Sequence, residues 1–85
     1  MIKIGNAYIN PLHIASIYTE DTINNKFTVK VSLNGYYGPN RKDVLTAGVY
    51  DTLEDAVATL DSLNVKIDLE LLSGLNWTIQ QKPMV

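Results

Sequence analysis

The residues of this chain best suited to binding chemistry lie in one loop that contains a glycine-proline turn. Tyr36 and Tyr37 precede that turn, and Arg41 and Lys42 follow it. Aromatic rings beside guanidinium and ammonium groups can stack on nucleic-acid bases and hold phosphates. The same residue types are frequent hot spots of protein–protein interfaces. A solvated hairpin loop also needs polar residues, so the pattern leaves a protein contact, a nucleic-acid contact and a plain connection open.

The nucleic-acid hypothesis adds two further lysines to this loop, and together they would form a small basic patch. Lys26 and Lys30 lie on the polar side of a predicted strand that leads into the loop. The overall charge argues against that ligand, because 7 Lys and Arg against 9 Asp and Glu give a net charge of −2 at pH 7. The protein therefore has no overall positive electrostatic potential that would attract phosphate backbones or an anionic membrane.

The remaining binding candidate is Trp77, the largest apolar side chain of the sequence. It is either part of the core or an exposed anchor for a partner or for a second copy of the chain. The chain has 5 tyrosines and 1 phenylalanine, which suggests that most of its aromatic side chains occupy partly solvent-exposed positions. This balance favours an interaction surface.

Thiolate chemistry is excluded by composition, and a nucleophile–base pair is hard to build. The chain has no cysteine, so it can form no disulfide, thiolate nucleophile or thiolate metal site. The single histidine, His13, follows Pro11 in a turn and has no carboxylate near it in the sequence. A structural or surface role is therefore favoured over that of a base or metal ligand.

The carboxylates are better explained by folding than by chemistry. Acidic residues around the start of a predicted helix complement its dipole, although a hard-cation site could use the same groups. Asp68 and Glu70 share a predicted strand face with Lys66, where a solvated surface is favoured over acid–base work. We expect a non-enzymatic protein with no metal and no cofactor. The helix-associated carboxylates are Asp51, Glu54, Asp55 and Asp61.

A strand over Lys26–Leu33 is the clearest structural element of the sequence. Phe27, Val29, Val31 and Leu33 alternate with polar residues, which is typical of a strand with one buried and one wet face. The strand is predicted to end at Asn34-Gly35, because both residues tolerate positive φ. Further strands are predicted at Ile2–Ile4, Ala7–Ile9, Ala15–Tyr18 and Val44–Tyr50.

One amphipathic helix is predicted to begin after Thr52, a suitable N-cap, and to end at Asn64. After it, Val65–Leu71 and Leu75–Ile79 alternate between apolar and polar residues, which predicts a C-terminal hairpin. A helix across Asp68–Leu75 is the alternative, because apolar residues there also recur every four positions. The hairpin is favoured because the alternation is unbroken over seven residues. The apolar stripe of the predicted helix is formed by Leu53, Ala56, Val57, Leu60 and Leu63.

These elements predict an α+β fold in a single domain, residues 1–85. One small antiparallel sheet of five to seven strands carries a helix of about residues 53–63 on one face, together with the C-terminal hairpin. The hydrophobic content of 46% is that of a globular protein. No window approaches the roughly 18 apolar residues of a membrane span. With no signal peptide and no cysteine, we expect a cytoplasmic protein.

Three segments together resemble a known family. They are Ile9–Ile17 with its Asn-Pro start, Thr28–Gly35, which ends in Asn-Gly, and Val49–Val57 at the start of the helix. This pattern, over residues 9–60, resembles the small bacterial flagellar and swarming-motility proteins of the FlbD family. The resemblance implies a sheet-plus-helix layout and an accessory protein without catalysis. It implies no functional residue, and residues 36–43 and 65–85 depart from the family pattern.

The sequence therefore predicts a small binding or regulatory protein of bacterial or phage origin. Strand edges and the loop from Tyr36 to Lys42 are expected to contact a larger host or cellular protein, and strand edges also allow a homo-oligomer. The alternative is a weak nucleic-acid-binding accessory protein, and no membrane contact is expected. The predicted partner-binding residues are Tyr36, Tyr37, Arg41, Lys42 and Trp77.

Overall fold

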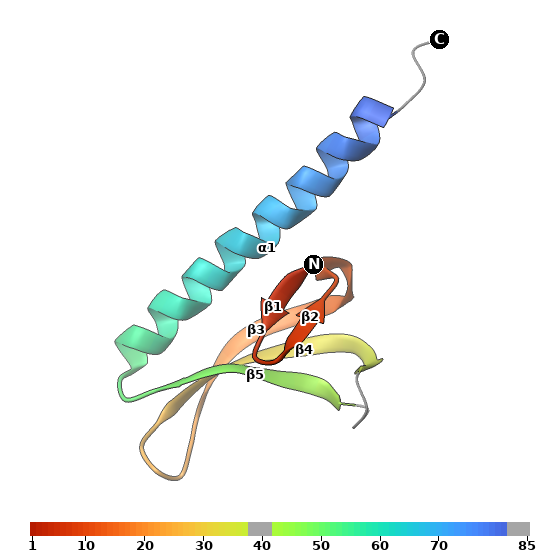
Figure 1. Ribbon diagram of the computed structural model, residues 1–85. Helices are drawn as coiled ribbons and strands as arrows, with labels where there is room; N and C mark the ends of the chain where they lie inside the picture. Colours follow the sequence, from red (N-terminus) through yellow and green to blue (C-terminus); the bar gives the residue numbers. More distant parts are fainter. Residues whose placement is uncertain (38–41, 82–85) are drawn as a thin grey trace.

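A computed structural model describes residues 1–37 and 42–81, which form five strands, one short 3-10 turn and one long helix (Figure 1). Side chains are described for residues 1–35 and 43–73. In chain order the elements are β1 (Ile2–Ile4), β2 (Ala7–Ile9), η1 (Pro11–His13), β3 (Ile14–Asp21), β4 (Phe27–Tyr37), β5 (Lys42–Tyr50) and α1 (Leu53–Gln81).

The strands form two separate antiparallel sheets. β1 pairs with β2, and β3, β4 and β5 form a three-stranded sheet in that order. The α+β class is confirmed, but the predicted single sheet of five to seven strands is wrong. The chain turns at Asn10, whose side chain accepts a hydrogen bond from the backbone N of Leu12 at 3.1 Å. Because the following Pro11 lacks a backbone N–H, the ladder stops here and β2 does not pair with β3.

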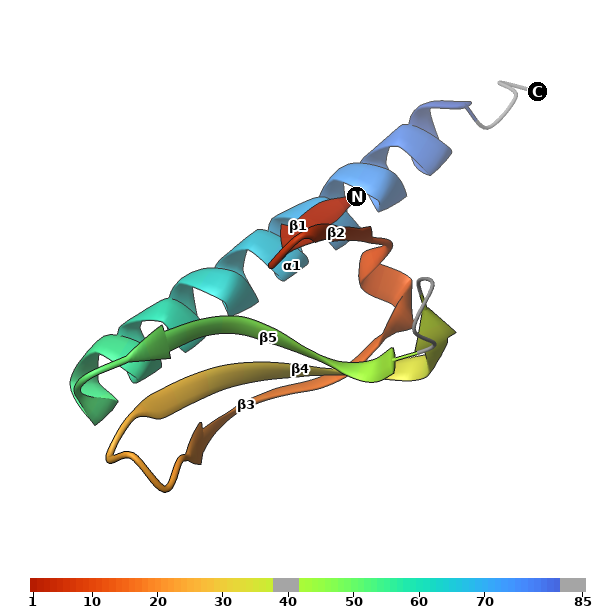
Figure 2. The ribbon, with the colours of Figure 1, turned by 60° about the horizontal axis from the view of Figure 1, so that its bottom comes forward.

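Both α1 and the β1–β2 hairpin lie on one face of the three-stranded sheet (Figure 2). The core forms between these layers, and the central strand supplies Val29 and Val31, both 0% exposed. The apolar side of the alternation predicted for this strand is therefore confirmed as a buried face. Its polar side is not uniformly wet, because Thr28 is 6% exposed and Lys30 and Ser32 are half-buried. The buried hydrophobic residues are Ile2, Ile4, Ile9, Val29, Val31, Leu33, Ala56, Leu63 and Ile67.

The central strand is longer than predicted. β4 continues past Asn34-Gly35 to Tyr37, which pairs with Lys42 of β5. The Asn34 side chain donates a hydrogen bond to the backbone O of Leu12 at 3.4 Å, so it ties β4 to η1 rather than forming a turn. An irregularity in the β4–β5 pairing spans this part of the strand.

The pairing of β4 with β5 contains a bulge near Gly48. Val29 pairs with Gly48 but Lys30 pairs with Thr46, so Ala47 has no residue opposite it. Such an extra residue bends the strand and increases its twist.

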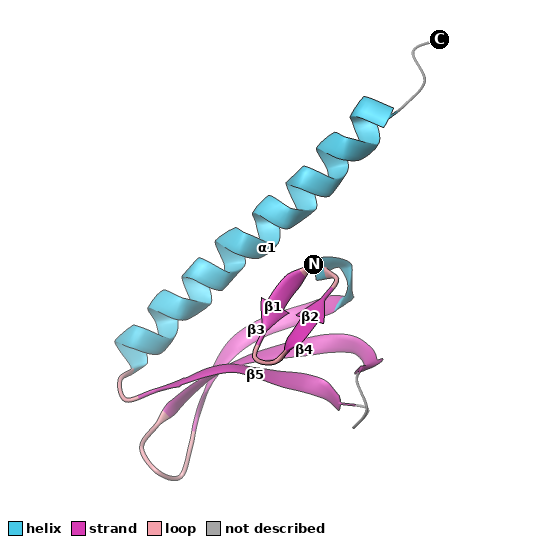
Figure 3. Ribbon diagram, in the orientation of Figure 1, coloured by secondary structure: helices cyan, strands magenta, loops and turns pink. Residues whose placement is uncertain are grey.

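The long helix is the largest departure from expectation. Thr52 is confirmed as its N-cap, since its Oγ1 accepts a hydrogen bond from the backbone N of Asp55 at 3.1 Å. The predicted end at Asn64 and the predicted C-terminal hairpin over 65–79 are wrong, because α1 continues to Gln81 (Figure 3). Residues 65–71 alternate, yet Leu63 and Ile67 also lie four apart and bury one helix face on the sheet. The burial of this helix face on the sheet therefore overrides the local alternation.

Candidate protein-binding surfaces

The loop singled out from the sequence connects β4 to β5. Tyr36 and Tyr37 end β4, and the backbone of Lys42 at the start of β5 pairs with Tyr37. The side chains of these three residues and the whole of Arg41 lie outside the described part of the chain. Trp77 belongs to α1, and its side chain also lies outside. Their binding roles stay predictions.

The basic patch proposed from the sequence is not assembled around this loop. Lys26 immediately precedes β4, eleven positions before Tyr37, which corresponds to roughly 35 Å of extended strand. Its Nζ forms an ion pair with the carboxylate of Asp51 beside the start of α1. Lys30 is half-buried in the middle of β4. The two lysines thus lie away from the hairpin end.

The titratable groups considered from the sequence include His13 and several carboxylates. His13 is exposed at the end of η1, where its backbone N donates to the backbone O of Asn10 at 2.9 Å. Within residues 1–37 and 42–81, no three His, Asp or Glu side chains gather in a way that could hold a metal ion. Asp68 and Glu70 do not share a face, because two positions on a helix differ by about 200°. The predicted strand face that carries both is therefore wrong.

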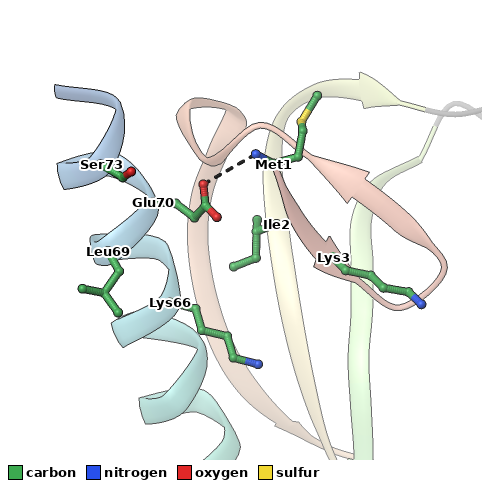
Figure 4. A pocket seen from close by; sticks show the side chains of 7 residues that line it. All are labelled: Met1, Ile2, Lys3, Lys66, Leu69, Glu70 and Ser73. Carbon is green, nitrogen blue, oxygen red and sulfur yellow. Dashed lines mark ion pairs between the residues drawn. The ribbon is translucent and has the colours of Figure 1, made fainter. Parts of the chain in front are cut away.

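A shallow groove of about 470 Å³ separates α1 from the start of β1. In Figure 4 the Glu70 carboxylate faces the Met1 amino group, and the two are 3.6 Å apart. Both partners are largely exposed, so this ion pair contributes little to stability. The groove is open and has mixed polarity, which makes it a poor pocket for a small molecule. Its lining residues are Met1, Ile2, Lys3, Lys66, Leu69, Glu70 and Ser73.

The side of α1 turned away from the three-stranded sheet carries an exposed apolar stripe, of which Leu69 also lines the groove beside β1. Val65 is 56% exposed, Leu69 is 61% exposed and Leu72 is 54% exposed. Successive helix residues are about 100° apart, so these three point roughly 140–160° away from the buried Ile67. We call this surface the outer helix face, formed by Ala58, Ser62, Val65, Leu69 and Leu72.

The second surface is the face of the three-stranded sheet that α1 does not cover. Tyr18, Lys30 and Thr46 lie side by side across its three strands. Val49 is 58% exposed there, beside a buried Thr28. No described helix or strand lies on this side (Figure 2). We call it the open sheet face, formed by Ser16, Tyr18, Glu20, Thr28, Lys30, Ser32, Val44, Thr46 and Val49.

Comparison of the chain with protein-family models, with curated proteins and with solved structures finds no match. The resemblance to the FlbD family therefore stays an expectation from the sequence. Over the described residues, α1 and η1 include no segment whose length and apolarity would let it cross a bilayer.

The outer helix face was missed in the sequence although its signal was present. Val65, Leu69 and Leu72 follow one another at intervals of four and three residues, which is helical spacing. The same residues were assigned to strand alternation, and this hid the second stripe. The open sheet face follows directly from the predicted alternation of β4, which puts Lys30 and Thr28 on the wet side.

Proposed function

We propose that this chain is a small non-enzymatic binding or regulatory protein that acts in the cytoplasm by contacting a larger protein. A bacterial or phage origin is part of this proposal and is supported by the FlbD-like segments. The observation that carries the proposal is that α1 and the β1–β2 hairpin cover the same face of the three-stranded sheet. The open sheet face is left to solvent and is the binding surface we assign.

The composition of this face suits a protein partner. Val49 offers apolar area, and Tyr18 offers a ring with a polar end, the kind of side chain that anchors interfaces. Lys30 and Glu20 supply charges of both signs at the edge of this apolar area. A mixed, moderately apolar patch of this kind resembles non-obligate interfaces rather than a core.

The strand edges provide a second route of contact. β3 and β5 are the outer strands of the sheet, and no further described strand pairs with them. An extended segment of a partner can add to such an edge through backbone hydrogen bonds. The β4–β5 hairpin end with Tyr36, Tyr37 and Lys42 lies at one end of this sheet, so the predicted loop contact is compatible with the same mode.

A nucleic-acid ligand is the second candidate, and one observation favours it. Tyr18 lies directly opposite Lys30 on the open sheet face, and an aromatic ring beside a cation on an uncovered sheet is suited to base stacking. The net charge of −2 and the pairing of Lys26 with Asp51 both weaken it. A protein partner remains the preferred assignment.

The experiment compares partners of tagged wild type and two variants in cells that carry the gene. Val49→Lys puts a charge in the open sheet face. Ile23→Lys makes a similar change at a side chain that is 100% exposed in the β3–β4 turn. A specific protein should co-purify with wild type and Ile23→Lys and be lost with Val49→Lys. The proposal is contradicted if the Val49→Lys variant still co-purifies with the partner protein, or if no specific protein co-purifies with wild type.

The nucleic-acid alternative is tested with the same purified proteins. Labelled single-stranded DNA and RNA oligonucleotides are titrated at low salt, with fluorescence anisotropy as the readout. Binding that weakens steeply with salt and is lost in Lys30→Ala would favour nucleic acid over protein. We expect no binding.

A further inference from the structure

The centre of the outer helix face is exposed, and it lies almost opposite the face that α1 packs on the sheet. At its flank, Ser62 and Leu69 line grooves beside the β1–β2 hairpin. The inner stripe is buried, with Ala56 at 0%, Leu63 at 7% and Ile67 at 8% exposure. The outer stripe keeps more than half of Val65, Leu69 and Leu72 in contact with solvent. A helix that is apolar on two opposite sides is typical of one that packs between two layers.

The spacing of the outer stripe identifies the kind of second layer. Its members follow one another at intervals of four, three, four and three residues. This seven-residue repeat is the pattern of helices that pair along their length in a coiled coil. A flat or irregular protein surface does not require such a repeat. The members in order are Ala58, Ser62, Val65, Leu69 and Leu72.

We propose that the outer helix face binds the same face of a second copy of this chain, with the two helices parallel. A two-fold symmetric pair satisfies this self-complementary repeat without a further partner. In such a pair the three-stranded sheets of the two copies lie on the far sides of their helices. In Figure 1 the C-terminal end of α1 projects beyond the sheets.

The charges beside the stripe favour the parallel arrangement. Asp61 directly precedes the stripe residue Ser62. In a parallel pair, a residue in this position faces the residue that lies five positions later in the sequence of the other copy. Asp61 of one copy then meets Lys66 of the other, and symmetry gives this pair twice. In an antiparallel pair the side that carries Asp61 and Asp68 meets the same side of its partner, which brings aspartates together. All three charged side chains are exposed.

The interface is short, since the described stripe covers about two repeats and begins with the small residues Ala58 and Ser62. Small interfaces support weak, concentration-dependent association. We expect a dissociation constant on the order of 10 µM, so that the chain changes from monomer to dimer over an ordinary working range of concentration. This self-association goes beyond the proposed function and uses a different surface.

The test is sedimentation equilibrium of the full chain at protein concentrations from micromolar to near-millimolar. Wild type should convert to dimer. Leu69→Gln should weaken association at least tenfold, and Leu72→Gln should act in the same direction. Leu12→Gln is the matched control, because Leu12 is 71% exposed but belongs to η1. Far-ultraviolet circular dichroism verifies that every variant is folded.

Charge reversal tests the orientation. Lys66→Asp alone should weaken the dimer, because it places a carboxylate against Asp61 of the other copy. The double variant Asp61→Lys with Lys66→Asp should restore it. Wild type that stays monomeric at every concentration, or a dimer indifferent to Leu69→Gln, overturns the proposal. A dimer that the double variant fails to restore overturns the parallel arrangement. None of these outcomes decides the partner experiment, which depends on Val49.

Discussion

Replacing Ile67 by alanine, with Leu69→Ala beside it, tests whether the second half of the chain packs as described. Ile67 is 8% exposed and belongs to the core cluster, whereas Leu69 is 61% exposed on the other side of α1. Removing a buried isoleucine side chain costs about 2–5 kcal/mol. Only one helix packs on the sheet at this position, so neighbouring side chains can move into the space that the substitution leaves. We therefore expect a loss of stability in the lower half of that range, about 2–3 kcal/mol. Leu69→Ala should change stability by less than about 0.5 kcal/mol.

Urea unfolding followed by circular dichroism measures the difference. A slope of about 1 kcal/mol per molar urea for a small domain turns the Ile67→Ala cost into a midpoint shift of roughly 2–3 M. The protein concentration should be near 1 µM, so that self-association does not add to the stability of any variant. Leu69→Ala should leave the midpoint almost unchanged.

The comparison of the two variants separates the helix from a strand. In a strand, Ile67 and Leu69 share one face and both substitutions have similar costs. On α1 they lie on opposite sides, so the costs should differ by about 2 kcal/mol or more. Equal costs for the two variants, whether both large or both small, would refute the packing of α1 described above.

Three smaller predictions concern the ends of elements. Thr52→Ala should destabilise the chain by about 1 kcal/mol through loss of the helix N-cap, measured by urea unfolding, and Thr52→Ser should retain most of the stability. Gly5→Ala should destabilise by about 1–2 kcal/mol, because Gly5 has φ +59° and an added Cβ would lie 3.1 Å from the carbonyl O of Thr46; an unchanged melting temperature would contradict this. Lys26→Met should change stability by no more than about 0.5 kcal/mol, since both Lys26 and Asp51 are substantially exposed, and wild-type stability should depend little on added salt.

The sequence predicts the first two-thirds of the fold well because several signals there agree. The alternation of β4 is supported by polar residues at every second position, and Thr52 marks the helix start with a specific hydrogen bond. The break in the strand at Pro11 can also be predicted from the sequence. What the local pattern does not indicate is that this break separates β1 and β2 into a sheet of their own, since strand pairing depends on where the chain goes afterwards.

The region after Asn64 is ambiguous because one sequence satisfies two periods. Residues 65–71 alternate strictly, yet Leu63 and Ile67 also recur at helical spacing. Tertiary packing decides between them, since Leu63 and Ile67 join the core cluster when this segment is a helix. The outer helix face depends on the same decision, which is why its residues could be found in the sequence but not interpreted. The roles of Tyr36, Tyr37, Arg41, Lys42 and Trp77 stay predictions.

The layout of the core has a consequence for the nascent chain on the ribosome. β3, β4 and β5 are neighbours in sequence and can form as soon as they emerge. The isoleucines of β1 and β2 instead wait for Leu63 and Ile67, which are synthesised much later and close the longest loop in the fold. These isoleucines are therefore fully protected from solvent only after α1 has been made, and a chaperone can reach them until then.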